Sequence, residues 1–142
     1  MVLAACSGKP EPLTVKQFQV RDQVRNEDEN PMVLMEKQRR LLGAVSMEER
    51  RQRLGQYYTL LWSDPAGVGQ GDVRVLFQYQ QGATASLVKH MSKDFSSSTA
   101  KGVAEFAVIG DDYFKSGKVL TWKATVTRGG KELASKQSYL WQ

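Results

Sequence analysis

One stretch near the C-terminal end constrains the fold of this chain more than any other. Apolar and polar residues alternate there, and the apolar positions are Leu120, Trp122, Ala124 and Val126. A period of two is typical of a β-strand that buries one of its faces. Gly129-Gly130 follows, and two glycines readily adopt the positive φ angles that a type I′ hairpin turn requires. The stretch therefore predicts a β-hairpin with one apolar face.

The predicted turn also sets the register of the two strands. With Gly129-Gly130 in the turn, Arg128 faces Lys131. Continuing outward, we expect three further pairs, which are Val126 with Leu133, Trp122 with Gln137 and Leu120 with Tyr139. This register places nearly all the large apolar groups of the hairpin on one side, so the turn and the hydrophobic pattern agree.

Other alternating stretches fill residues 56–142. We expect strands at 56–62, 73–79, 84–91 and 104–108, with loops rich in glycine, proline and serine between them. Together with the hairpin they make six short strands, which predict an antiparallel β-sandwich. Their density resembles that of immunoglobulin-like and fibronectin type III domains. A single cysteine excludes the disulfide of antibody domains and any cysteine-rich zinc site.

The residues before the sandwich follow a different pattern. Leu13 to Val24 alternates like a strand, and Asn30-Pro31 is a helix start with Asn as N-cap. Ser46 and Glu49 form a capping box, which predicts a second short helix ending at Gly55. We therefore expect an α+β chain in which a short helical segment precedes the sandwich. Its parts are a tether at 1–12, a strand and helical extension at 13–55, and the β-sandwich at 56–142.

The first residues resemble a known processing signal. Leu3-Ala4-Ala5-Cys6, followed by small residues, resembles the lipobox of bacterial lipoproteins. In that family the bond before the cysteine is cleaved and its thiol carries diacylglycerol. The resemblance implies that Cys6 is lipidated, and Ser7 after it implies the outer membrane, facing the periplasm. The alternative is a cytosolic terminus with an incidental cysteine.

The lipobox lacks the segment that normally precedes it. A signal peptide needs a basic region and about 7–15 apolar residues, whereas five residues precede Cys6 here. We therefore expect the natural start to differ from Met1.

Candidate catalytic and metal-binding groups are few. His90, the only histidine, lies on a predicted strand that places it near Val73, and no G-x-S-x-G motif accompanies it. Asp111-Asp112 lacks the ligand series of an EF-hand, so we expect these residues to begin a turn. The glycine-rich run at 67–71 lacks the lysine of a phosphate-binding loop. We therefore predict no enzyme activity, cofactor or metal.

Basic residues form the most plausible functional surface. The chain carries a net charge of +5, and most of its arginines lie between residues 21 and 53. Arginine can bind phosphate or carboxylate groups of a polymer or phospholipid. Glutamates four residues before Arg40 and Arg53 offer the alternative of ordinary ion pairs on a helix surface. The candidate anion-binding residues are Lys37, Arg39, Arg40, Arg50, Arg51 and Arg53.

Three functional hypotheses follow from these patterns. The first is a lipid-anchored, non-enzymatic envelope protein whose sandwich serves a structural role or binds a protein partner. The second is a binding module for an anionic envelope polymer or lipid, acting through the arginine-rich helices. The third is a small hydrolase, which the missing motifs disfavour. Nucleic acid is not an expected partner, because no recognition motif is present.

Overall fold

The computed structural model describes residues 11–21, 30–41, 43, 46–84 and 86–141. Cys6 and the end of the expected first strand, Val24, lie outside the described residues. The strands are β1 Leu13–Val20, β2 Gly55–Ser63, β3 Val73–Gln81, β4 Lys89–Phe95, β5 Lys101–Ile109, β6 Val119–Arg128 and β7 Lys131–Gln137. The helices are α1 Pro31–Leu41, α2 Met47–Arg53 and α3 Gly110–Ser116, with one 3₁₀ turn at Pro65–Gly67.

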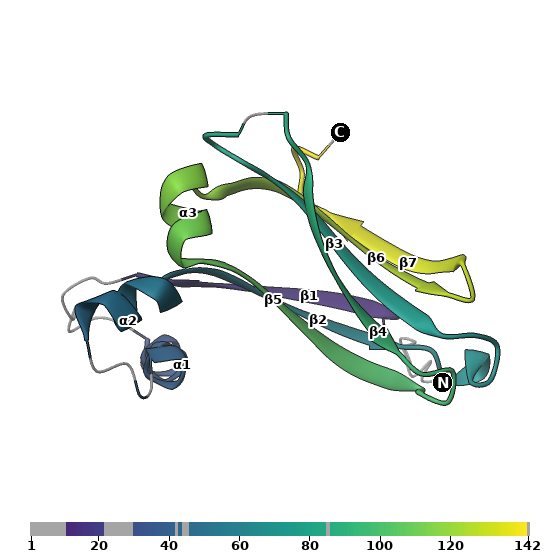
Figure 1. Ribbon diagram of the computed structural model, residues 1–142. Coiled ribbons are helices and arrows are strands. Elements are labelled where there is room, and N and C mark those ends of the chain that lie inside the picture. Colours follow the sequence, from purple (N-terminus) through teal and green to yellow (C-terminus); the bar gives the residue numbers. More distant parts are fainter. Residues whose placement is uncertain (1–10, 22–29, 42, 44–45, 85, 142) are drawn as a thin grey trace, which may run out of the picture.

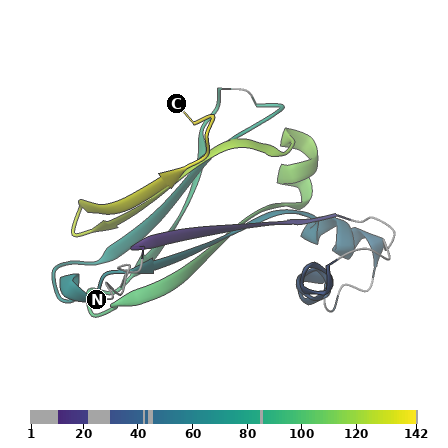
Figure 2. The same cartoon turned by 180° about the vertical axis from the view of Figure 1, so that it is seen from behind.

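The strands form two antiparallel sheets, ordered β1-β2-β5 and β4-β3-β6-β7. The sheets face each other, which makes a β-sandwich with short helices, as the alternating stretches predict. Figures 1 and 2 show α1 and α2 on the side of the three-stranded sheet that faces away from the four-stranded sheet. The helix α3 connects β5 in one sheet to β6 in the other at the same end of the molecule.

Aromatic rings from both sheets fill the core between them. The Phe77 ring lies 4.6 Å from the Tyr58 ring and 5.6 Å from the Phe106 ring, measured between centroids. Trp122 packs beside Tyr58 and Phe77. Burial of such large apolar side chains is the main favourable contribution to folding.

A second apolar cluster lies on the other face of the three-stranded sheet. Val20, Leu54 and Tyr57 are buried there, and Phe18 and Leu41 pack against them. Leu41 ends α1 and Leu54 follows α2, so this cluster attaches the helical layer to the sheet. The strand β1, expected in the N-terminal extension, is paired along its whole length with β2.

The predicted helix starts are confirmed. The Asn30 side-chain oxygen accepts a hydrogen bond from the Met32 amide at 2.9 Å, and Pro31 is the first helical residue. At α2, the Ser46 hydroxyl accepts from the Glu49 amide while the Glu49 carboxylate accepts from the Ser46 amide. These contacts satisfy amides that lack a partner within their own helix.

The terminal hairpin is confirmed in its turn and corrected in its register. Gly129 and Gly130 both have positive φ, and Arg128 pairs with Lys131. A bulge between Val126 and Thr127 shifts the register, so Val126 pairs with Ala134 instead of Leu133. Gln137 pairs with Lys123 instead of Trp122. A second irregularity, opposite Gln80 and Gln81, pairs Gln81 with Val119. Val119 is therefore buried and Leu120 is 48% exposed, contrary to the prediction.

Two other expectations were wrong in detail. The strand expected at 84–91 begins only at Lys89, so His90 pairs with Gln78 and Val73 pairs with Phe95. Asp111 and Asp112 lie in the first turn of α3 and do not begin an isolated turn. Carboxylates near a helix N-terminus are stabilised by the exposed amides and the helix dipole.

The fold makes a direct prediction about Trp122. Its side chain is 8% exposed in the aromatic core, so Trp122→Ala should lower the free energy of unfolding by about 3–5 kcal/mol. The matched variant Leu120→Ala, two residues away on the same strand, should lower it by less than about 1 kcal/mol. Urea denaturation of the two variants measures the difference. Equal losses would contradict the observed register.

Candidate functional site

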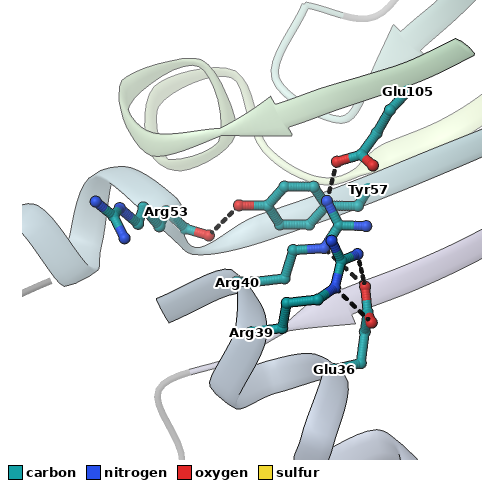
Figure 3. Close-up of polar contacts among 6 residues, drawn as sticks. All are labelled: Glu36, Arg39, Arg40, Arg53, Tyr57 and Glu105. Carbon is teal, nitrogen blue, oxygen red and sulfur yellow. Dashed lines mark hydrogen bonds and ion pairs between the residues drawn. The ribbon is translucent and has the colours of Figure 1, made fainter. Parts of the chain in front are cut away.

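The arginine-rich helices hold Arg40 in a contact network with the sheet (Figure 3). The Arg40 guanidinium lies 4.3 Å from the centroid of the Tyr57 ring and forms ion pairs with Glu36 and with Glu105 of β5. Its side chain is only 9% exposed. The Tyr57 hydroxyl in turn donates to the Arg53 carbonyl at 2.7 Å. Arg40 therefore joins α1 to β2 and β5.

Arg39 projects further into solvent from the same helix. It binds Glu36 at 2.6 Å, and the pKa of Glu36 is lowered chiefly by this hydrogen bond, with Arg40 adding to the effect. The predicted pairing of Glu36 with Arg40, one helical turn apart, is present at 2.8 Å. The Arg39–Glu36 pair is exposed to solvent on the Arg39 side and should add little to stability.

Arg51 connects the other short helices. Its guanidinium lies 3.0 Å from the Asp111 carboxylate and 4.5 Å from the centroid of the Phe114 ring, both on α3. The hydrogen bond from Arg51 is the main reason that the pKa of Asp111 is lowered. The remaining candidates, Lys37, Arg50 and Arg53, are half-buried on the same helical layer. The structure thus gathers all six cations in one layer and engages Arg39, Arg40 and Arg51 with carboxylates.

Sequence reasoning missed a buried arginine at the opposite end of the sandwich. The Arg128 side chain is 3% exposed, and its Nε donates to Asp64 Oδ2 at 2.8 Å. Its Nη groups donate to the carbonyls of Asp64, Gly71, Ser97 and Thr99 at 2.8–3.3 Å. A guanidinium has five N–H donors, and the five bonds use all of them. Arg128 lies on the same side of β6 as the buried residues Trp122 and Val126. This period of two could have predicted from the sequence that Arg128 is buried.

These bonds tie three connections together. The Asp64 and Gly71 acceptors belong to the β2–β3 loop, Ser97 and Thr99 to the β4–β5 loop, and Arg128 borders the hairpin turn. Gly67 completes the packing, because a Cβ atom there would lie 2.0 Å from Asp64 Oδ2 and 2.8 Å from Arg128 Nε. We call residues 64–72, 96–100 and 129–130 the loop end. The bonds of Arg128 thus hold the loop end together.

The arrangement closest to catalytic chemistry lies near α3. Lys89 Nζ is 3.2 Å from Ser116 Oγ, a distance that suits a serine–lysine pair. The same ammonium also binds Asp112 at 2.6 Å, and an ammonium has no lone pair with which to accept the serine proton. Asp112 also accepts a hydrogen bond from Tyr79, whose pKa is raised by burial and by this carboxylate. The group therefore fits a structural ion-pair network.

His90 lies on the outer face of β4, exposed to solvent and opposite Gln78. The aspartate four residues on, Asp94, is engaged by Arg74 at 2.8 Å. The nearby Ser96 hydroxyl interacts with the hydroxyls of Ser98 and Thr99. The structure thus does not assemble His90, Asp94 and a serine into a triad.

Comparison with family models, curated proteins and solved structures finds no match to this chain. Among the described residues, no group of three or more histidine, cysteine or acidic side chains is placed to hold a metal ion. No described helix is long and apolar enough to cross a membrane.

The Arg128 network predicts a contrast between two arginines of the same sheet. Arg128→Met should cost about 3–5 kcal/mol, because it leaves the Asp64 carboxylate and several carbonyls without their partner. Arg74→Met removes an exposed pair with Asp94 and should leave the unfolding midpoint almost unchanged. Chemical denaturation of both variants tests this. If Arg128→Met is as stable as Arg74→Met, the network does not hold the loop end.

Proposed function

We propose that this chain is a lipid-anchored, non-enzymatic protein of the bacterial cell envelope, and that its β-sandwich is a structural or protein-interaction module. One observation carries the non-enzymatic part of the proposal. Several charged groups that could take part in binding or catalysis instead join one element of the fold to another. They are Arg40, Arg51, Arg128 and Lys89. Residues used in this way serve packing and positioning.

The strand order supports a more specific class of sandwich. Lettered in chain order as A, B, C, C′, E, F and G, the strands give the sheets A-B-E and C′-C-F-G. In immunoglobulin constant-type domains, the fourth strand pairs with the fifth, whereas β4 here pairs with β3. We infer an immunoglobulin-like sandwich that resembles fibronectin type III domains in the placement of this strand.

The lipid anchor rests on the resemblance at Cys6 and is compatible with the fold. Six residues separate Cys6 from Leu13, and they can span about 20 Å when extended. Leu13 pairs with Trp62 beside the loop end, whereas Val20, at the other end of β1, pairs with Gly55 near the helices. An anchored chain would therefore hold the loop end nearer the bilayer. The helical layer would lie farther away by the length of β1, about 26 Å.

This orientation bears on the second hypothesis, binding of an anionic polymer or lipid by the helices. Arg40 and Arg51 already contact a carboxylate and an aromatic ring each. A new anion would compete with these partners, and it would have to reach the helical layer from a distance if it belonged to the same bilayer. The interaction-module hypothesis is therefore the better supported of the two.

The anchor is tested by fractionating cells that express the natural reading frame. Cys6→Ser should move the protein from the membrane to the soluble fraction, because two or three acyl chains are needed for stable anchoring. Ser7→Ala keeps the thiol and should remain in the membrane fraction, which makes it the matched control. Circular dichroism of Cys6→Ser should match that of the unaltered protein, because every described element follows Cys6. A membrane-bound Cys6→Ser variant would remove the lipoprotein assignment.

A further inference from the structure

The outer face of the four-stranded sheet carries an ordered array of mostly uncharged side chains. Strand pairing aligns them in rows that run across the sheet. One row consists of His90, Gln78, Lys123 and Gln137, and the next consists of Ser92, Leu76, Thr125 and Ser135. We call these the central rows. No described helix covers this face (Figures 1 and 2).

Paired polar groups lie on either side of the central rows. Thr121 donates to the Gln80 side chain at 2.9 Å on one side, and Arg74 binds Asp94 at 2.8 Å on the other. Within the described part of the chain, the polar side chains of the central rows make no hydrogen bond or ion pair. The central rows therefore present donors and acceptors that are not paired within the described part of the protein.

The chemistry of this band selects the kind of ligand. An anionic polymer requires several cations, and the central rows contain one lysine, Lys123, and no arginine. A protein interface is usually centred on aromatic or arginine anchors, and Leu76 is the only large apolar group. Glutamine amides, and the hydroxyls of serine and threonine, can both donate and accept hydrogen bonds. These are the capacities that match the hydroxyl groups of a sugar.

The geometry suits an extended ligand. Neighbouring strands lie about 4.8 Å apart and successive rows about 7 Å apart, so the central rows form a shallow band about 14 Å long. Tyr139, just beyond the end of β7, is 99% exposed. The residue before it is held to β6, because the Ser138 amide donates to the carbonyl of Trp122, which precedes Lys123 of the first row. An exposed aromatic ring offers an apolar face against which the C–H side of a pyranose ring can pack.

We propose that the central rows bind a neutral polysaccharide strand. The proposal does not depend on the anchor at Cys6. It also does not depend on the arginine-rich helices, which lie on the other sheet.

The test is co-sedimentation of the full chain with three insoluble neutral probes, namely chitin, cellulose and curdlan. We expect binding to at least one probe that persists in 0.5 M salt (roughly, a Debye length of a few ångströms), because the ligand is uncharged. The double variant Gln78→Val with Thr125→Val removes an amide and a hydroxyl while keeping side chains that favour strands. It should weaken binding about tenfold or more, given the usual contribution of two hydrogen bonds.

The matched control makes the same changes in the other sheet, Thr14→Val with Gln17→Val on β1, and should bind as the unaltered chain does. Should the double variant unfold, Ser92→Lys with Ser135→Lys replaces it, because lysine is well tolerated on edge strands and would obstruct the same rows. The proposal is overturned by failure to bind all three probes or by binding that disappears in salt. Equal loss in the control, or full binding by both central-row variants, would overturn it as well.

Discussion

Complete pairing of one buried guanidinium determines how the two sheets meet at the loop end. Removing Arg128 from water would be costly unless every donor found an acceptor. Its partners come from the end of β2, from the turn before β3 and from the connection between β4 and β5. Most of these acceptors are backbone carbonyls. The need to pair every donor of Arg128 therefore constrains the path of the backbone as well as the identity of side chains. Gly67 follows from the same constraint, since a side chain there would collide with the ion pair.

The sequence allowed the strands to be predicted because alternation and turn residues act locally. Gly129-Gly130 specified the hairpin turn, and the buried positions of β3 followed from their period. The register of β6 was predicted wrongly because its pairing with β3 and with β7 contains a bulge in each case. A bulge inserts one residue and so reverses the side that later residues face. Leu120 illustrates this, since it is apolar yet lies outside the core. The short helix α3 was missed because Gly110 and two aspartates also suit a turn.

The site was less predictable, since its contacts join distant residues. The pairing of Glu36 with Arg40 could be inferred from a spacing of four residues. The contacts of Arg40 with Glu105 and of Arg51 with Asp111 could not, because they depend on where the helices pack. A run of basic residues therefore resembled a binding surface in sequence, whereas Arg40 and Arg51 attach the short helices to their neighbours. The central rows became visible only once strand pairing had placed Gln78 beside Lys123 and Thr125 beside Ser135.

In this account the strongest charges stabilise the fold, and the mostly uncharged central rows are proposed to serve recognition. Its central claim is that Arg128 is held by the native structure as a whole. Hydrogen exchange of the arginine Nε–H groups, followed by nuclear magnetic resonance, tests this claim most directly. The account predicts that the Arg128 Nε–H exchanges only on global unfolding, while that of Arg74 exchanges rapidly. Rapid exchange of Arg128 under native conditions would contradict it.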